Sequence, residues 1–213
     1  MALFLGLDSS TQGLKAILID PVRGRIAASG AVNYEADLPE YGCVGGVLPN
    51  PDPLVKHADP LLWLAALDLV LERLKAAGAP LAEVEGVGGS GQQHGSVYLN
   101  ARFVEIVGNL RPEESLATQL RPTLSRKTAP IWMDSSTGAE CAEMMLSTGC
   151  ALQAVTGSPA IERFTGSQIR KFWKTDPEGY AATRRIHLVS SFLCSVLSGA
   201  DAPVDSGDEA GGS

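Results

Sequence analysis

Three apolar segments separated by short polar turns open the chain. They cover residues 3–8, 14–19 and 25–32. Segments of this length, bounded by turn-forming residues, are typical of β-strands. A small polar turn joins the first two, and a turn containing Pro21 and Gly24 joins the second and third. The pattern predicts three consecutive strands that form half a sheet and need a covering element.

A helical period supplies that cover. Asp59 is a good N-cap and Pro60 suits the first helical position. Apolar residues then recur at helical spacing, at Trp63, Leu67, Val70, Leu71 and Leu74. The helix is expected to end before Gly78, and residues 84–90 are expected to form another strand. The resulting strand–helix–strand order indicates the α/β class.

Residues 33–58 show neither period and are rich in turn formers: Pro39, Gly42, Gly45, Gly46, Pro49, Pro51 and Pro53. Long irregular segments in compact chains are more often functional than idle. This segment is therefore predicted to cap a binding cleft, or alternatively to be a surface excursion.

The second half of the chain begins with a weakly patterned stretch over residues 101–128. A short strand is predicted over residues 129–133, followed by a helix that ends at Gly149. Thr137 and Glu140 have the spacing of a capping box at the start of that helix. Further elements are predicted at 166–175 (helix), 177–183 (helix) and 186–198 (strand or short helix).

Composition narrows the class of protein. The 213 residues suffice for one large domain or a domain and a half. The net charge of −7 argues against a nucleic-acid-binding surface. No apolar stretch approaches the ~18 residues of a membrane span, and residues 1–10 lack the features of a signal peptide. We expect a soluble, cytoplasmic protein with neither nucleic acid nor membrane as partner.

The cysteines do not indicate a metal or disulfide framework. Cys43, Cys141, Cys150 and Cys194 form no CxxC pair, and none has a histidine at metal-ligand spacing. They are interpreted as free thiols of a reducing compartment.

The turn after the first strand is the first candidate site. Asp8 ends the strand, the turn consists of Ser9, Ser10, Thr11, Gln12 and Gly13, and Lys15 starts the return strand. Small residues allow backbone N–H groups to approach an anion such as phosphate. The Asp8 carboxylate would suit a phosphate-bound Mg²⁺. The alternative is an ordinary hairpin with a solvated aspartate.

Polar residues between glycines follow the strand at 84–89. Gln92, Gln93 and His94 offer both hydrogen-bond donors and acceptors, which suits a polyhydroxy ligand. Their place at the end of a strand is typical of residues that line a cleft. The alternative is a structural histidine.

Two further segments carry candidate sugar-binding groups. Trp132 and Asp134 combine an indole, which packs on sugar C–H faces, with a carboxylate that accepts hydroxyl protons. A core tryptophan followed by an N-cap aspartate is the alternative. Arg163 precedes a predicted helix and presents a fork of donors, either to a ligand or to a neighbouring carboxylate such as Glu162.

Several common motifs are missing from the sequence. It contains no GxxxxGK[ST] loop, no GxGxxG after a strand, no GxSxG elbow and no HExxH pair. The commonest nucleotide-loop, dinucleotide, serine-hydrolase and zinc-protease classes are thereby excluded, which favours a phosphate turn combined with a polar cleft.

Seven segments in order resemble the FGGY carbohydrate kinases, and among them the xylulokinases of eukaryotic type. They are GLDSSTQGLKAILID (6–20), DLPEYGCVGGV (37–47), SGQQHGSVY (90–98), IWMDSST (131–137), IERFTGSQI (161–169), RIHLVSSF (185–192) and PVDSGDEAGG (203–212). The resemblance implies an actin/hexokinase-like ATPase fold. Residues 1–213 would form its first, sugar-binding lobe, which is ribonuclease-H-like with a mixed sheet flanked by helices.

The same resemblance implies residue roles. Sugar binding falls to His94, Gln93, Arg163, Trp132 and Asp134. The phosphates of ATP would face Asp8, Ser10, Thr11, Gln12, Gly13 and Lys15, with Asp8 near Mg²⁺. The implied reaction moves the γ-phosphoryl group of MgATP to the 5-hydroxyl of D-xylulose or of a related ketose or polyol, and proceeds chiefly by positioning and charge neutralisation.

One departure from the family limits this reading. Its general base is an aspartate in a Gly-Asp-Asn type motif of the second lobe, and this sequence has no such motif. Asp205 and Asp208 match a different, upstream segment. The chain is therefore expected to lack the nucleotide-binding lobe, as a truncated form, and to be inactive alone. The alternatives are a non-catalytic sugar-binding or regulatory module and one half of a split kinase. A second lobe or a second copy of the chain is an expected partner.

Overall fold

A four-stranded mixed sheet forms the base of the molecule. The structure is a computed structural model that describes residues 2–208, with the side chain of Cys150 outside the description. The strand order is β3-β2-β1-β5. β1 (Leu3–Ser9), β2 (Gly13–Asp20) and β3 (Arg25–Asn33) are antiparallel, and β5 (Val84–Gly91) runs parallel to β1. The four predicted strands are confirmed.

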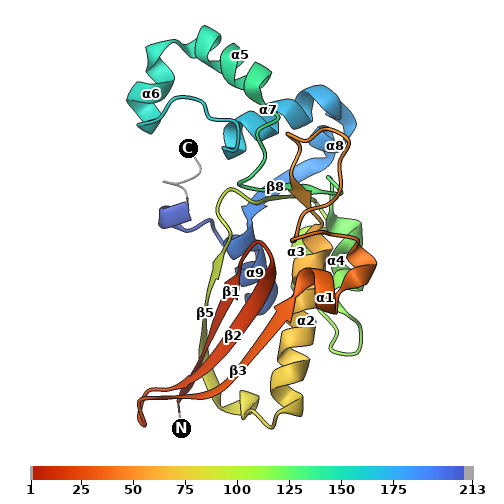
Figure 1. The fold of residues 1–213 in the computed structure, drawn as a ribbon, viewed down its shortest axis with the longest axis vertical. Coiled ribbons are helices and arrows are strands. Elements are labelled where there is room, and N and C mark those ends of the chain that lie inside the picture. Colours follow the sequence, from red (N-terminus) through yellow and green to blue (C-terminus); the bar gives the residue numbers. More distant parts are fainter. Residues whose placement is uncertain (1, 209–213) are drawn as a thin grey trace.

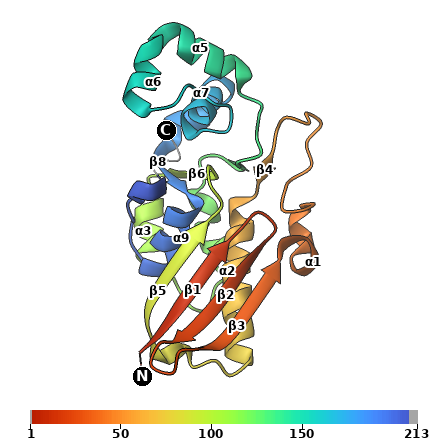
Figure 2. The ribbon, with the colours of Figure 1, turned by 60° about the vertical axis from the view of Figure 1, so that its left-hand side comes forward.

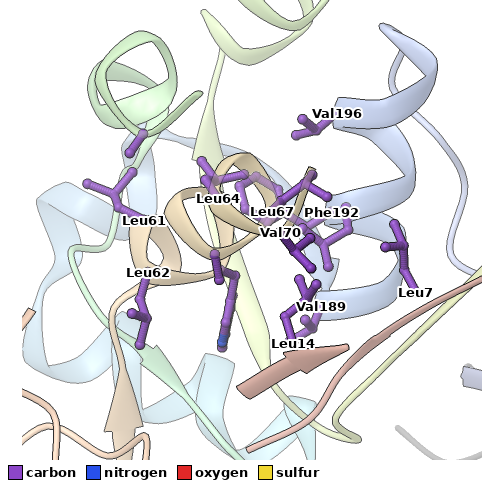
Figure 3. Packing of buried hydrophobic residues seen from close by; sticks show 14 of the residues in the cluster. Leu7, Leu14, Leu61, Leu62, Leu64, Leu67, Val70, Val189, Phe192 and Val196 are labelled. Atoms are coloured by element: carbon purple, nitrogen blue, oxygen red, sulfur yellow. The ribbon is translucent and has the colours of Figure 1, made fainter. Parts of the chain in front are cut away.

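One face of this sheet is covered by α2 (Pro60–Ala76) and α9 (Val189–Ser198). The Asp59 side chain caps α2 as predicted, accepting a hydrogen bond from the Leu61 N–H at 2.8 Å. Side chains from both helices and from the sheet meet in the core, where Leu67, Val70, Leu14 and Phe192 lie together (Figure 3). α2 packs on β2 and β3, and α9 packs on β5, so two helices hold the sheet from behind.

The opposite face of the sheet carries exposed side chains. Figure 2 shows the sheet in front of α2, with no described element in front of the strands. Leu5 and Leu7 of β1 point to the core, whereas Phe4 and Asp8 point to the open face. Asp8 lies opposite Lys15 of β2 and Ser90 of β5. The strand register therefore places the candidate residues Asp8 and Lys15 next to each other, with Ser90 on the other side of Asp8.

The segment at 33–58 is largely irregular, as predicted. It contains α1 (Tyr34–Asp37), the 3-10 turn η1 (Pro39–Tyr41) and the short strand β4 (His57–Ala58). β4 pairs with β7 (Ala129–Pro130). The predicted strand over residues 129–133 is thus shorter than expected, because Trp132 and Met133 already lie in a turn.

A two-stranded sheet closes the other end of the core. β6 (Ser96–Asn100) pairs antiparallel with β8 (Thr183–Leu188). The element expected at 186–198 is divided between the end of β8 and α9. The stretch at 101–128 contains the short helices α3 (Phe103–Val107) and α4 (Leu116–Leu120) and the 3-10 turn η3 (Arg121–Thr123), while η2 (Leu81–Glu83) precedes β5.

Four helices extend beyond the sheets. They are α5 (Gly138–Thr148), α6 (Cys150–Thr156), α7 (Thr165–Thr175) and α8 (Pro177–Ala182). α5 and α6 lie at the far end of the molecule from β1–β3 (Figure 1). α5, α7 and α8 confirm the sequence prediction, and α6 was not predicted. In residues 2–208 no helix combines the length and apolarity that a membrane span needs.

The predicted capping box of α5 is wrong. The Thr137 hydroxyl donates to the Glu162 carbonyl oxygen instead of accepting from the helix, and the Glu140 carboxylate accepts from Lys174 Nζ at 3.0 Å. Both side chains are drawn towards the segment that contains Arg163 and α7. A tertiary contact has replaced the local cap.

Candidate functional site

The turn after β1 is held by its own backbone and by its neighbours. The N–H and the hydroxyl of Ser10 both donate to the Gly13 carbonyl oxygen, each at 3.0 Å. The Gln12 carbonyl accepts from the Tyr34 N–H at 3.0 Å. A Cβ at Gly13 would lie 2.4 Å from the Val32 carbonyl oxygen, so no side chain fits there. From the sequence, Gly13 is expected to face an anion, but nothing in the sequence indicates that Val32 lies against it.

The Asp8 side chain is exposed near the end of β1, next to this turn. Its carboxylate accepts a hydrogen bond from the Ser90 hydroxyl at 2.9 Å. Lys15 is also exposed and lies opposite Asp8 across β1 and β2. No group of three or more His, Cys, Asp or Glu residues suited to a metal ion occurs in the described part of the chain. A cation here would take Asp8 as a single protein carboxylate, which fits a Mg²⁺ that keeps mostly phosphate and water ligands.

A cleft of ≈ 820 Å³ opens beside the turn. Its walls come from the turn, from the irregular segment after β3, and from the turn after β7; they comprise Ser10, Thr11, Gln12, Val44, Gly45, Val47, Leu48, Pro49, Asn50, Lys56, Trp132 and Met133. Residues 44, 45 and 47–50 of the irregular segment therefore line a cleft, which agrees with the prediction that the segment caps one and not with a mere surface excursion.

Trp132 forms a hydrogen bond to the turn after β1. Its indole Nε1–H donates to the Thr11 hydroxyl at 2.9 Å, across 121 residues of sequence. From the sequence, Trp132 is expected to bind the sugar and Thr11 to face the phosphates of ATP. The structure brings these two side chains into direct contact at one wall of the cleft.

Gly46 allows the irregular segment to lie against the same turn. Its φ is +83°, and a Cβ on it would come 1.8 Å from the Thr11 carbonyl oxygen. The neighbouring Gly45 N–H donates to the Glu35 carboxylate at 2.7 Å. The two glycines are the sequence signal for this close approach, although the sequence does not say what is approached.

His94 and Arg163 come together in a second group. The imidazole of His94 is 7% exposed and packs on the Phe164 ring with centroids 5.1 Å apart. The Arg163 guanidinium carbon lies 5.9 Å from the centre of the same ring. Burial, aided by the charge of Arg163, lowers the pKa of His94. A neutral imidazole both donates and accepts a hydrogen bond, as hydroxyl recognition requires.

The loop that carries His94 exposes one of its glutamines and buries the other. Gln93 is exposed, whereas Gln92 is buried. His94 has a φ of 59°, a left-handed conformation that is uncommon outside glycine. The backbone of this loop therefore has a special shape at a candidate ligand residue.

Asp134 is buried and fully engaged within the protein. The carboxylate accepts hydrogen bonds from the Lys56 N–H at 2.9 Å, from the Ser136 hydroxyl at 2.6 Å and from Gln168 Nε2 at 2.7 Å. His57 Nε2 lies 3.4 Å from it. Burial alone would raise the pKa of Asp134, but the hydrogen bonds from His57, Ser136 and Lys56 outweigh it and hold that pKa well below its ordinary value.

Asp134 links the two groups of candidate residues. Trp132, on one side, precedes it by two residues in sequence. On the other side, Gln168 Nε2 bridges Asp134 and the carbonyl oxygen of Glu162, the residue before Arg163. Asp134 therefore lies behind the cleft, and its partners fix both Lys56 and the backbone next to Arg163.

Comparison with curated proteins gives strong sequence matches. The chain is 44% identical over 213 residues to xylulose kinase 2 of Arabidopsis thaliana, covering 99% of this chain and 38% of that protein. It is 42% identical over 209 residues to the xylulose kinase of Rattus norvegicus, covering 97% and 39%. The chain thus spans less than two fifths of the length of these relatives. No family model matches it.

Solved structures agree on the fold. The xylulose kinase from Bifidobacterium adolescentis superposes with a TM-score of 0.68 at 21% identity, over 99% of this chain and 39% of that one. The enzyme from Rhodospirillum rubrum gives a TM-score of 0.67 at 19% identity, over 90% and 33%. The resemblance is therefore confirmed: the chain is a relative of the eukaryotic xylulose kinases, and it has the fold of a part of the FGGY carbohydrate kinases.

Proposed function

We propose that this chain is the sugar-binding part of a carbohydrate kinase that phosphorylates D-xylulose or a related ketose or polyol with MgATP. The observation that carries the proposal is that a buried His94 and Arg163 both lie against the Phe164 ring, in a chain similar along its length to xylulose kinases. Donor and acceptor atoms of these two residues can bind vicinal hydroxyl groups.

The proposed sugar contacts differ in their structural support. His94 and Arg163 both contact the Phe164 ring, and Gln93 is exposed next to His94. Trp132 stands at the wall of the cleft, where its ring can pack on sugar C–H groups. Because the oxygens of Asp134 already accept hydrogen bonds from the protein, we assign it the task of holding Lys56 and Gln168 in place.

The proposed phosphate contacts lie on the turn after β1. Ser10, Thr11, Gln12 and Gly13 would present the turn to the phosphates of ATP, Lys15 would add positive charge, and Asp8 would bind Mg²⁺. The exposed carboxylate of Asp8 beside a tight, glycine-containing turn fits this role. Bound MgATP supplies the γ-phosphoryl group, and the residues of this chain position the acceptor relative to it.

In this proposal, no residue of this chain acts as the general base. Removing a positioned base typically lowers a rate by ~10²–10⁴, so we expect sugar binding without turnover from these 213 residues. A cytoplasmic location also remains a proposal, in keeping with the free thiols of Cys43 and Cys141.

The experiment is an assay of ADP production by the purified chain with MgATP, with and without D-xylulose. Absence of sugar-dependent ADP from folded chain supports the proposed division of labour, and recovery of turnover on adding the separate remainder of a related kinase would favour the split-kinase alternative. Sugar-dependent turnover by the chain alone would contradict the assignment of the base to another part.

A further inference from the structure

Gln92 is a buried side chain whose amide group is left unpaired. The residue is 9% exposed, and neither its Nε2 nor its Oε1 finds a hydrogen-bond partner within residues 2–208. Its backbone N–H, by contrast, donates to the Ser9 carbonyl oxygen at 2.9 Å, so the residue is firmly placed at the end of β5. Buried polar atoms are normally paired, and an unpaired one is costly.

Other unpaired polar atoms belong to neighbouring segments. His94 Nδ1, two residues further on, also has no partner within the described chain. The segment after Phe164 contains the Thr165 hydroxyl and the Gln168 Oε1, which likewise have no partner there. The contact of the His94 and Phe164 rings shows that the two segments adjoin. Besides the Gln92 amide, the segments that carry His94 and Arg163 thus contain three further polar atoms without a partner in residues 2–208.

The chain pairs a buried glutamine fully where it serves the fold alone. Gln119 in α4 is 7% exposed, close to the exposure of Gln92. Its Oε1 accepts from the Arg111 N–H at 2.8 Å, and its Nε2 donates to the carbonyl oxygens of Arg111 at 3.0 Å and Glu114 at 2.7 Å. The unpaired amide of Gln92 is thus not a general property of buried glutamines in this protein.

We infer that Gln92 binds the sugar and helps to select it. Its amide would donate to one hydroxyl of a polyhydroxy ligand and accept from a neighbouring one, since each hydroxyl can play both parts. This inference rests on the proposed function and assigns recognition to the buried Gln92 in addition to the exposed Gln93. A site built to pair with hydroxyls rejects analogues that lack them, so the ligand class is a ketose or polyol with adjacent hydroxyl groups.

The test compares Gln92→Met with the matched variant Gln119→Met. Methionine has nearly the volume of glutamine but needs no hydrogen bonds. In the ligand-free chain, Q92M should leave the melting temperature unchanged or raise it, whereas Q119M should lower it because three hydrogen bonds are lost. In a calorimetric titration with D-xylulose, Q92M should weaken binding at least about tenfold, and Q119M should bind like the wild type.

Three other results would overturn the role of Gln92, and one of them would also overturn the proposed function. A melting temperature lowered in Q92M as much as in Q119M would mean that the Gln92 amide is paired within the fold, and the inference would fall. Unchanged D-xylulose affinity in Q92M, with clear binding by the wild type, would overturn the role of Gln92 and leave the proposed function standing. Absence of binding by the wild type to D-xylulose and to its deoxy and polyol analogues would overturn both.

Discussion

His94 combines a left-handed backbone conformation, burial and a lowered pKa. His94 has a positive φ although it is not glycine, and such backbone strain costs of order 1 kcal/mol and gathers at functional sites. The same residue is buried and its pKa is lowered. A purely structural histidine has no need of this combination, which supports a role in ligand binding.

The pH dependence of stability should depend on Asp134. Its folded-state pKa is below the unfolded value of about 3.9. The carboxylate therefore contributes stability that is fully present above about pH 4 and is lost as the pH falls further. Asp134→Asn should cost ~3 kcal/mol at pH 7, because a buried charge network loses its centre. Urea unfolding at several pH values measures both effects.

In that series, the difference between wild type and D134N should shrink below pH 4. A difference that stays constant from pH 7 to pH 3 would contradict the assigned ionisation. Asp176→Asn is a suitable control, since Asp176 caps the short helix α8 through the Gly179 N–H far from this network.

The sequence indicates which segments carry candidate ligand residues, but it does not indicate which of those side chains are buried or which partners they have. The motif around Gln92 and His94 is predicted from the sequence to bind a ligand, but the sequence does not tell which glutamine is buried. The interpretation of Asp134 as a sugar ligand left out Gln168, which is 34 residues away in the chain. Such partners are brought together by tertiary packing and leave no local pattern.

At the scale of elements, strands and helices with a clear hydrophobic period were predicted correctly, whereas the buried strand β6 was not. The strands β1–β3 and β5 and the helix α2 match the prediction closely. β6 was missed because four of its five residues are buried, so no polar alternation marks it. The capping box at Thr137 was wrong since both side chains found partners in another segment. Local signals fail where tertiary contacts compete for the same groups.

The close approach of Gly46 to the turn after β1 gives a prediction at this scale. Gly46→Ala should destabilise the chain by more than Gly24→Ala. Both positions have positive φ, 83° and 60°, but a Cβ at Gly24 meets nothing within 4 Å, whereas one at Gly46 strikes the Thr11 carbonyl. In both variants the strained backbone should lower the free energy of unfolding by ~1 kcal/mol. In G46A the displacement of the segment around residue 46 should lower it further.

Urea denaturation of the two variants measures this difference. G46A should also change the fluorescence of Trp132, because the Trp132 indole bonds to Thr11. Equal stabilities of G46A and G24A, with unchanged fluorescence, would mean that residues 44–47 do not rest on the turn.

At the scale of the whole molecule, the sheet has one covered and one open face (Figure 2). The open face carries exposed apolar residues on three adjacent strands, namely Phe4, Ile17, Ile19 and Ile26. Phe4 lies opposite Ile19, and Ile19 lies opposite Ile26. Contiguous apolar patches of this kind mark interaction surfaces, and the relatives are more than twice as long as this chain.

We predict that the purified chain self-associates through this face. Ile26→Lys should shift the concentration-dependent equilibrium towards the monomer in analytical ultracentrifugation, since a charge in an apolar contact is costly. Val22→Lys is the matched control, because Val22 is exposed in the turn between β2 and β3, outside the strands. A wild-type chain that stays monomeric at all concentrations would contradict the prediction.

The central claim is that these residues form a sugar-binding site at His94 and Arg163. Its most direct test is a calorimetric titration of D-xylulose into the wild-type chain and into Arg163→Ala. We expect binding by the wild type and a loss of ~1–3 kcal/mol in binding free energy for R163A, with unchanged circular dichroism. Equal affinity of a folded R163A, or no binding by the wild type, would contradict the account.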